Sequence, residues 1–444
     1  MRYLLALLFS LAFLQAMTLE ETVAYALKNN NSLKQSDVAI ERSKALRDNK
    51  NAQNYGRLDF MASYDHYNMP RTLAPLTPIA IFTSPNGPGS IPTTKDMFTA
   101  GVAYNVTLFD GFARKNAYDI SDLQYQNAAI KSKLGREEVI YNVRTLYITL
   151  LALQEQLDAQ RIYTASKEKL LASVKHERQL GSKARIDELK AQNSLEASRA
   201  KESTMKAGIT SVKAALSSLM GDKEFDSAVA VKIMVNGAEE IETDYDISSL
   251  KRCQAAEIDI KASTKKREQS KAGYYPRIDF NAYYGQNLGP NDTTNNDPST
   301  GNAIIEKGDW NNQEIWQLGL KLKWNILDFG STSTINQEAM LSHMNARLKS
   351  EGVRIELRKN ITTAQSDIML AAAQYKSASS QFRLLSETEK IEQIRYENDA
   401  LTLTDLLDTS AEKELAHAQM LNAKYNYQKA KYYLDYLLEK GENR

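Results

Sequence analysis

The sequence predicts a mainly α-helical protein with a small β part, built from two internal repeats. All nine prolines fall in two short stretches, 70–92 and 276–298, and the 183 residues from Thr93 to Tyr275 contain none. Because proline breaks a helix interior, this distribution indicates long uninterrupted helices with two interruptions. Around both stretches apolar and polar residues alternate as they do in strands. The segments that surround the two stretches resemble each other at an offset of about 220 residues.

The N-terminus is predicted to be a signal peptide over residues 1–16. Arg2 precedes the apolar run Tyr3–Leu14, and Ala16 offers a small residue for cleavage. The run is too short to span a bilayer as a helix, and the alternative is a buried N-terminal helix. No later stretch has about 18 consecutive apolar residues, so we expect no transmembrane helix. An exported chain of this kind is either a soluble periplasmic or secreted protein or an outer-membrane barrel.

The repeat is visible in two matched pairs of segments. Tyr55-Gly-Arg-Leu-Asp-Phe60 recurs as Tyr275-Pro-Arg-Ile-Asp-Phe280, and Leu108-Phe-Asp-Gly is echoed by Ile326-Leu-Asp-Phe-Gly. A nearly constant offset indicates one supersecondary unit used twice. The predicted boundaries are helices at 17–56, a β-hairpin at 57–110 with a loop at 70–96, a long helix, turn and return helix at 111–221, a mixed insertion at 222–247, a helix at 248–275, a second hairpin at 276–328 with a loop at 289–312, a second long helix, turn and return helix at 329–440, and a tail at 441–444.

Four segments of about 8 to 12 residues alternate strictly and are predicted to be strands: Leu58–Tyr64, Phe98–Leu108, Ile278–Tyr284 and Trp316–Ile326. Trp316 and Trp324 share one face eight residues apart, roughly 26 Å, which is close to the height of a lipid-facing band between aromatic girdles. The alternative is an ordinary antiparallel sheet packed on a protein core. Four strands cannot close a membrane barrel, and open edges cannot face lipid, so several chains must pool their strands; three would give twelve.

The long helices are expected at Phe112–Gln179 and Ser331–Arg395, each about 100 Å in length. Val139, Val143, Leu146, Leu150, Leu153 and Leu157 follow a heptad spacing, which we interpret as helix packing. Shorter partner helices are expected at Leu19–Asn54, Ile186–Met220, Ser248–Gly273 and Thr404–Glu439. The turns fall at Leu180–Lys183 and Asp399–Thr402. The insertion carries a β-like run, Val229–Val235, and we derive no role for it.

Composition excludes several functional classes. The 56 Lys and Arg residues balance 55 Asp and Glu residues, so no basic field favours nucleic acid. The single cysteine, Cys253, excludes an intrachain disulfide framework and is expected to be a small buried apolar residue. The four histidines lack metal-ligand spacing, and Asp328-Phe329-Gly330 lacks the other kinase motifs. We therefore expect no enzyme activity, no cofactor and no metal.

The repeat and the exported N-terminus resemble the TolC family of outer-membrane channel proteins over essentially the whole mature chain. The strongest match is Tyr396-Glu-Asn-Asp-Ala-Leu-Thr-Leu-Thr-Asp405-Leu-Leu-Asp408, followed by Asn422-Ala-Lys-Tyr425-Asn-Tyr427. Thr18–Asn30 is similar to the family's opening helix, and the Leu-Phe-Asp-Gly and Leu-Asp-Phe-Gly strand exits are frequent in it. One departure is the second turn, where Asp399-Ala400 stands in place of a glycine-containing sequence.

The resemblance implies a homotrimer in the outer membrane, with most of its mass in the periplasm. Twelve strands would form a transmembrane barrel, continued by a periplasmic coiled-coil barrel of helices. The protein would be the exit duct of a tripartite efflux or type I secretion system, working with a periplasmic adaptor protein and an inner-membrane pump of the RND or ABC type. The cargo, a small molecule or a polypeptide, stays open. An exported coiled-coil scaffold or surface adhesin is the alternative, which has no need of paired strands with aromatic ends.

The resemblance also implies candidate site residues. Asp405 and Asp408 match positions that line the periplasmic constriction, where three copies would favour cations. The competing interpretation is that acidic residues in the first helical turn complement the helix dipole. Asp187 and Tyr396 match positions that hold the closed tip, although the basic partner in the second turn is not evident near Leu401. The adaptor would dock at the two turns, Leu180, Gly181, Ser182, Ala400, Leu401 and Thr402, and Trp316 and Trp324 would belong to the membrane aromatic belt.

Overall fold

The computed structural model describes residues 17–75, 91–221, 223–226, 228–235, 245–292, 294–296, 300–398 and 400–443. The predicted signal peptide at 1–16 and Asp399 lie outside the described residues. The chain divides into two compact units that we describe separately. The helical unit consists of Met1–Glu41, Asn127–Glu257 and Leu348–Arg444, and the sheet unit consists of Arg42–Gln126 and Ile258–Arg347.

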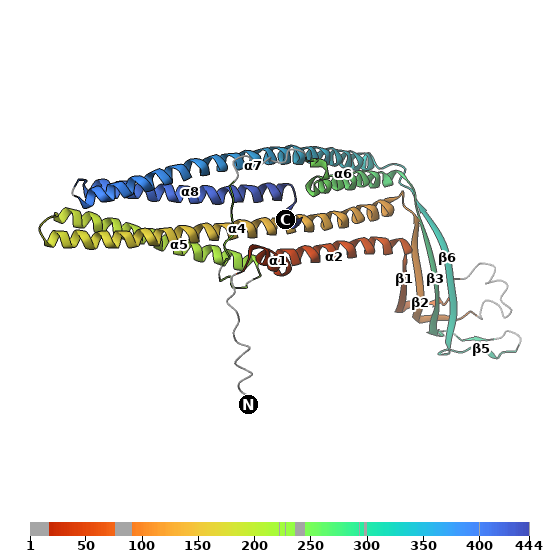
Figure 1. Ribbon diagram of the computed structural model, residues 1–444. Coiled ribbons are helices and arrows are strands. Elements are labelled where there is room, and N and C mark those ends of the chain that lie inside the picture. The colour runs from red at the N-terminus through yellow and green to blue at the C-terminus, as the bar shows by residue number, and fades with distance from the viewer. Residues whose placement is uncertain are drawn as a thin grey trace, which may run out of the picture. The chain divides into compact units, whose positions relative to one another are not determined.

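Four antiparallel strands form one sheet in the order β1-β2-β3-β6 (Figure 1). Their bounds are Arg57–Thr72 for β1, Thr93–Phe109 for β2, Arg277–Pro290 for β3 and Trp310–Lys323 for β6. Each repeat supplies one hairpin, and the two hairpins join because β2 pairs with β3 from Phe98↔Leu288 to Phe109↔Ile278. The sheet is therefore one layer shared by both repeats.

The strands are 14 to 17 residues long, so the expected length of 8 to 12 residues was wrong. Backbone pairing continues past the last apolar positions, to Thr72↔Thr93 in the first hairpin and to Pro290↔Trp310 in the second. Polar ends of strands lack the apolar alternation but pair equally well. Consequently the predicted loops at 70–96 and 289–312 begin and end inside strands, and the second contains the short strands β4, Asn295–Asn296, and β5, Ala303–Ile305. Residues 76–90 of the first loop lie outside the described residues.

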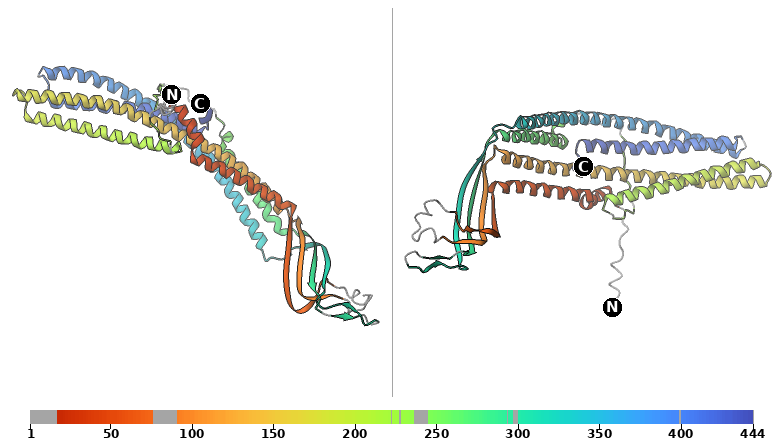
Figure 2. Two further views of the ribbon diagram at one scale, coloured as in Figure 1. Left: turned by 90° about the horizontal axis from the view of Figure 1, so that it is seen from below. Right: turned by 180° about the vertical axis from the view of Figure 1, so that it is seen from behind.

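The long helix and the return helix have the same lengths in both repeats. The two long helices, α4 (Ala113–Gln179) and α7 (Ser331–Glu397), each have 67 residues, and their return helices, α5 (Arg185–Leu219) and α8 (Leu403–Leu437), each have 35. The helices α1 (Leu19–Asn29), α2 (Asn31–Ala52) and α6 (Lys251–Ser270) complete the set, together with short 3₁₀ turns at Gln53–Tyr55, Ile247–Ser249, Lys271–Tyr274 and Gly441–Asn443. In Figures 1 and 2, α4 and α5 form one antiparallel hairpin, and α7 and α8 form the other. None of the helices in the described ranges is long and apolar enough to cross a membrane.

Asn30 divides the single helix expected at Leu19–Asn54. Its backbone leaves the helical region, with ψ of 127°, while its Oδ1 accepts hydrogen bonds from the backbone N–H groups of Ser32 and Leu33. This caps the start of α2. Its Nδ2 also donates to the carbonyl oxygen of Leu219, near the end of α5, at 2.9 Å. The buried amide thereby fixes both the break and the packing of α1 against the first hairpin.

The repeated Leu-Phe-Asp-Gly and Leu-Asp-Phe-Gly motifs are strand-to-helix turns. Asp110 accepts a hydrogen bond from the backbone N–H of Arg114, and Asp328 accepts one from that of Thr332, so each carboxylate occupies free donors at a helix start. The two residues that follow each aspartate have positive φ, 65° and 66° in the first repeat and 52° and 94° in the second. One of each pair is glycine, the residue that tolerates this backbone best.

The heptad positions of α4 form the core of the first repeat, as expected for packing. Val143 and Leu150 are fully buried, and Val139 and Leu157 nearly so. Val139, Val143 and Leu150 pack with residues of α1 and α5 in one apolar cluster that also includes Met220 and Phe225. A second cluster joins α6, α7 and α8, and it contains Cys253, which is 1% exposed, as predicted.

The insertion is not the expected strand. Of the described part of 222–247, only Ala228 makes a ladder contact, an isolated parallel bridge to Met17. The hydroxyl of Tyr147 lies 2.7 Å and 2.8 Å from the carbonyl oxygens of Met17 and Val229 and anchors both segments to α4. Val231 and Ile233 pack on the first core cluster, so the apolar alternation serves packing on helices and does not form a sheet.

Candidate functional sites: the sheet and the hairpin tips

One face of the four-stranded sheet is apolar and exposed. The register aligns Phe60, Val102, Tyr284 and Trp316 across all four strands, and neighbouring rows place Leu58, Leu318 and Leu320 on the same face. Phe60, Trp316 and Leu320 are 74%, 68% and 72% exposed. An exposed apolar surface of this extent requires cover by protein or by lipid.

The opposite face is polar. Asp279 accepts a hydrogen bond from Thr107 at 2.6 Å and pairs with Arg277 at 3.0 Å, and Lys321 lies opposite it in the register. Gly101 and Gly285 face each other across β2 and β3, where a Cβ on either would come within 3 Å of the Tyr283 hydroxyl. A sheet with one apolar and one charged face matches the alternation of a barrel wall between lipid and water.

The two edge strands, β1 and β6, each pair on one side only. Within the described residues the sheet is therefore open at both edges. Unpaired edge groups are a template for further strands, and they cannot be left in lipid.

Of the two tryptophans predicted for an aromatic belt, Trp316 lies on the apolar face of the sheet. Trp316 belongs to β6, and Trp324 follows the strand directly, is 54% exposed, and donates from its indole nitrogen to the carbonyl oxygen of Tyr274. The sequence argument missed the third tryptophan, Trp310, which begins β6 and contacts Phe98 with ring centroids 5.5 Å apart. Trp310 lies six residues before Trp316, and this even spacing, which places both on one face of a strand, could have identified it.

The two hairpin turns lie where the sequence placed them. Gly181 has a φ of 84° and its neighbours Leu180 and Ser182 are exposed. In the second turn Ala400 and Thr402 are exposed, Leu401 is half-buried, and the Thr402 hydroxyl accepts from the backbone N–H of Asp405 to cap α8. The second turn reverses without glycine, since Ala400 donates its backbone N–H to the carbonyl oxygen of Arg395 at 2.8 Å.

Asp405 and Asp408 lie one turn apart on the first turns of α8, and both are exposed. Asp405 accepts a hydrogen bond from the Thr402 hydroxyl at 2.6 Å, so it takes part in the helix cap. Asp408 has no hydrogen bond or ion pair to any described residue. Within one chain, the helix-cap interpretation therefore accounts for Asp405 but leaves Asp408 free.

The predicted closure residues belong to different local structures. Asp187 accepts from the backbone N–H of Ala184 at 3.3 Å and caps α5. Tyr396 is 7% exposed and packs in an apolar cluster that joins both hairpins. The ammonium of Lys183 lies 4.6 Å from the centre of the Tyr396 ring. Lys183 is a basic tip residue that the sequence argument missed, because it belongs to the first turn, whereas the basic partner was expected in the second.

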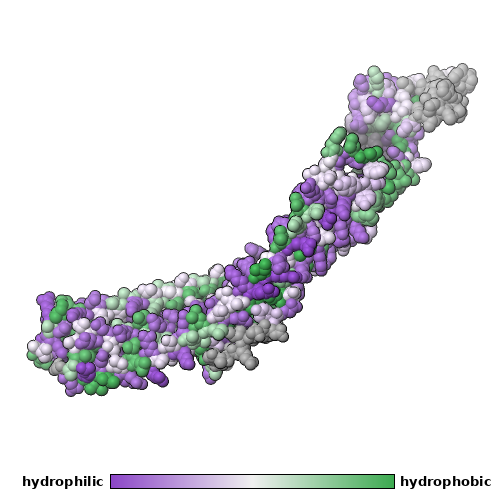
Figure 3. Space-filling view, turned by 90° about the horizontal axis from the view of Figure 1, so that it is seen from above, coloured by the Kyte–Doolittle hydropathy of each residue, from purple (hydrophilic) through white to green (hydrophobic). Residues whose placement is uncertain are grey.

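The outer surface of α7 carries an unpartnered apolar stripe. Leu348, Ile355 and Met369 are spaced by seven and fourteen residues and are 64%, 59% and 65% exposed, while Leu384 and Ile391 repeat the seven-residue step. Figure 3 shows apolar side chains in separate patches between polar ones on the visible surface. A heptad stripe that none of the described helices covers is the pattern of a helix that packs against another copy.

A buried polar cluster lies between the α4–α5 hairpin and the α7–α8 hairpin. Lys167 is 3% exposed, and its ammonium lies 4.7 Å from the ring centre of Tyr163. Burial lowers the pKa of Lys167 to about 8, despite the opposing attraction of Glu389. Glu389 is already occupied by Lys413 at 2.5 Å and by the Ser410 hydroxyl at 2.7 Å. No group of three or more potential metal ligands occurs among the described residues.

Comparison with known proteins shows similarity to outer-membrane efflux proteins. The family model for outer membrane efflux proteins matches residues 23–222 and 251–438, one segment in each repeat. The probable efflux pump outer membrane protein SepC and the toluene efflux pump outer membrane protein TtgF, both of Pseudomonas putida, are each 25% identical over 212 residues, which is 48% of this chain and 41% of each relative. The chain thus matches less than half the length of these relatives.

The fold is similar to that of solved outer-membrane channels. The CmeC outer membrane channel of Campylobacter jejuni superposes with a TM-score of 0.79 at 18% identity, over 95% of this chain and 86% of that one. At this identity the likeness concerns the fold alone, and it supports the predicted mainly helical fold with a small sheet.

Proposed function

This chain belongs to the outer membrane efflux protein family, and from that premise we propose that it forms the exit duct of a tripartite efflux or type I secretion system in the outer membrane. The observation that carries this proposal is the open-edged sheet whose exposed apolar face opposes a charged face. Such a sheet fits a wall between lipid and a wet lumen once further strands close it.

We infer that three copies assemble. Three sheets of four strands supply twelve, enough for a closed barrel. The same assembly would cover the exposed heptad stripe of α7, which its own chain leaves bare. The duct would perform no catalysis, and an inner-membrane pump of the RND or ABC type, joined through a periplasmic adaptor, would supply the energy. Helices of 67 residues rise about 100 Å along their axes, a length suited to a duct crossing the periplasm.

At the tips we propose that Asp408, together with Asp405, lines the constriction. Asp408 is exposed and lacks a partner in the described part of its own chain, so its carboxylate is free to act on passing ions. Three copies of each would give a ring of six carboxylates that favours cations. We further propose that Tyr396 and Asp187 stabilise the closed tip, with Lys183 as the basic partner, and that the turns Leu180–Ser182 and Ala400–Thr402 contact the adaptor.

The alternative, an exported scaffold or adhesin without transport activity, predicts different behaviour. A duct should require detergent for extraction from outer-membrane fractions, have three times the chain mass in mild detergent by light scattering, and conduct ions in planar bilayers. Extraction by salt or urea alone, or a monomer without conductance, would favour the scaffold. A Phe60→Lys/Leu320→Lys variant should lose membrane insertion, because charge on the lipid face is costly at mid-membrane. The matched control, Asp279→Lys on the polar face, should retain it.

A further inference from the structure

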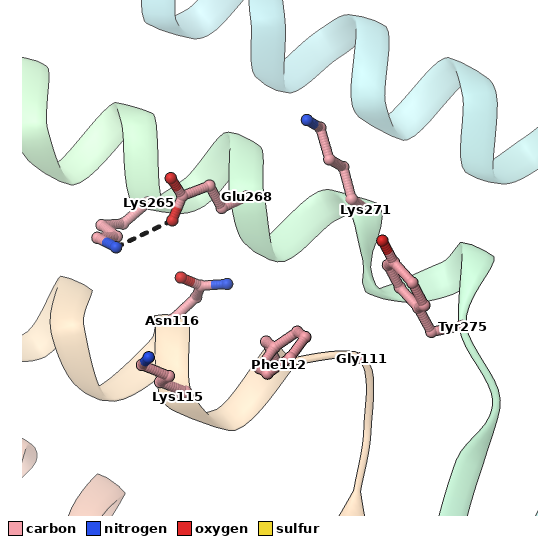
Figure 4. A pocket seen from close by; sticks show the side chains of 8 residues that line it. All are labelled: Gly111, Phe112, Lys115, Asn116, Lys265, Glu268, Lys271 and Tyr275. Carbon is pink, nitrogen blue, oxygen red and sulfur yellow. Dashed lines mark hydrogen bonds and ion pairs between the residues drawn. The ribbon is translucent and has the colours of Figure 1, made fainter.

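A pocket lies in the sheet unit where strands meet helices, and nothing described so far uses it. It has a volume of about 230 Å³ and is lined by the start of α4 on one side and the end of α6 with its following turn on the other (Figure 4). The lining residues are Gly111, Phe112, Lys115, Asn116, Lys265, Glu268, Lys271 and Tyr275.

Backbone contact holds the two walls together. Gly111 has a φ of 65°, and a Cβ at this position would lie 2.8 Å from the carbonyl oxygen of Ala272. Only glycine permits this approach, so the strand exit of the first repeat and the turn after α6 are fixed side by side. The pocket is thus a preformed feature of the junction.

Asn116 is the most informative residue of the pocket. It is 6% exposed, and its side chain points from α4 into the space between the two walls (Figure 4). Its amide makes no hydrogen bond to any residue that the structure describes. The residue as a whole is buried, but its amide borders the pocket, where a group from outside the chain can reach it. The arrangement therefore leaves a donor and an acceptor available to a ligand.

The charge of the pocket is positive. Three lysines face one carboxylate, Glu268, and that carboxylate is occupied by Lys265 at 2.9 Å. Lys265 also reaches Asp119 at 3.3 Å, so it is neutralised within the protein. Lys115 and Lys271 lie on opposite walls, both are exposed, and neither has an ion pair within the described ranges; the Lys271 ammonium is turned away from Asn116 (Figure 4). Because a lysine stem is flexible, both ammonium groups can swing toward a phosphate group placed at the Asn116 amide.

The pocket adjoins the apolar face of the sheet. The rings of Phe112 and Tyr275 both contact Phe109 edge-on, at 5.5 Å and 6.4 Å between centroids, and Phe109 pairs with Ile278 at the end of the sheet. An aromatic bridge therefore leads from the lysines to the face that we assign to lipid. This favours a ligand with a phosphate head and an apolar tail, because inorganic phosphate has no apolar group that could contact these aromatic rings.

We infer that this pocket binds the phosphate of an anionic phospholipid in the membrane leaflet that borders the helical end of the sheet. Lys115 and Lys271 contact the phosphate, Asn116 hydrogen-bonds the headgroup, and the acyl chains lie along Phe109 and the apolar face. Basic pockets at membrane boundaries bind anionic headgroups in this way. The inference depends on the sheet spanning the membrane, but it does not depend on the cargo or the pump.

The test uses the full-length protein in phosphatidylcholine nanodiscs with and without phosphatidylglycerol. Native mass spectrometry after release counts the retained lipids, and acetylation rates report the exposure of Lys115 and Lys271. In the Lys115→Gln/Lys271→Gln variant, phosphatidylglycerol retention should fall roughly 10- to 30-fold, as expected for the loss of two lysines near an anionic headgroup. The charge-matched control Lys261→Gln/Lys266→Gln, on the exposed surface of α6, should retain the lipid as the wild type does.

A second variant and a conductance measurement complete the test. Asn116→Leu should lower lipid retention without lowering thermal stability, because no hydrogen bond within the protein is lost. Channel conductance in planar bilayers verifies that each variant is assembled, and it separates a failure here from a failure of the proposed duct. Unchanged lipid retention in the double-lysine variant would overturn the inference. Protection of both lysines by inorganic phosphate but not by phosphatidylglycerol would also overturn it, in favour of a free-phosphate site.

Discussion

Lys167 tests how burial of a charge affects the free energy of unfolding. Its ammonium is buried, and the nearby carboxylate of Glu389 is already paired with Lys413. The pKa of this lysine is lowered from 10.5 to about 8 by burial. Each pKa unit corresponds to about 1.4 kcal/mol, so the shift amounts to a cost of about 3 kcal/mol when the folded protein holds the proton. Replacement by methionine keeps the length and removes the charge. We therefore expect Lys167→Met to raise the free energy of unfolding by up to about 3 kcal/mol at pH 7.

The two pKa values of Lys167 determine how the stability difference between variant and wild type changes with pH. Below pH 8 both the folded and the unfolded protein protonate Lys167, and the full cost is present. Between about pH 8 and 10.5 the unfolded state binds more protons than the folded state, so the stability of the wild type rises with pH and the advantage of the methionine variant shrinks toward zero. Tyr163, whose pKa burial raises to about 12, stays protonated in the folded protein over this range, and its ionisation in the unfolded state near pH 10 is common to wild type and variant, so it cancels in the difference.

The assay is guanidinium unfolding of the detergent-solubilised protein, followed by far-UV circular dichroism at one fixed protein concentration. The difference between variant and wild type is measured at pH 7 and pH 10. Lys169→Met is the matched control, since Lys169 is exposed on the same helix and should show no comparable gain at either pH. A gain from Lys167→Met that is equal at both pH values, or a loss at pH 7, would refute the reasoning and indicate that the ammonium is solvated or well paired.

Three other substitutions test the assembly, the tip and the fold. Leu348→Glu/Ile355→Glu should shift the protein from trimer to monomer in mild detergent by light scattering, because it charges the bare heptad stripe of α7; a trimer of unchanged stability would contradict the proposed interface. Asp405→Asn/Asp408→Asn should reduce cation preference and block by trivalent cations in planar bilayers, and Asp408→Asn alone should produce most of the change; unaltered reversal potentials would argue against a carboxylate ring. Asn30→Ala should lower the free energy of unfolding by about 2–3 kcal/mol, since it removes the cap of α2 and a buried bond to α5, and denaturant titration should detect it.

Much of the fold follows from sequence because its determinants are local. Periodicity alone located the four strands and the two long helices, since each buried or exposed stripe repeats over many residues. The predicted elements are wrong where a single tertiary contact decides the local structure. The break at Asn30 depends on a bond to Leu219, 189 residues away, and no local pattern announces it. The run Val229–Val235 alternates like a strand, but its apolar residues pack on helices, because tertiary contacts override local preference.

The site could be predicted less completely, for a physical reason. The resemblance located the tip aspartates, but their chemistry depends on which neighbours each carboxylate meets. Asp405 is drawn into the cap of its helix and Asp408 is not, although they stand three residues apart. Lys183 and Lys167 look like ordinary surface lysines in the sequence, yet one lies over a buried tyrosine ring and the other is itself buried.

The open sheet and the bare stripe of α7 both argue that a single chain is an incomplete molecule. In the sheet, every exposed apolar row ends at an edge strand that pairs on one side only, so lipid can cover the face but cannot satisfy the edge. In the helix, large side chains recur every seven residues on a surface that α8 does not cover. Pairing of β1 of one copy with β6 of the next would satisfy the edges, and packing of α7 on another copy would cover the stripe. We expect the two contacts to hold the same copies together, so charge placed on α7 should release strands from the membrane as well as separate the helices. Barrel disassembly by Leu348→Glu/Ile355→Glu, measured as loss of bilayer conductance along with loss of the trimer, is the expected sign of that coupling; a conducting barrel with frayed helices would show that the sheet assembles on its own.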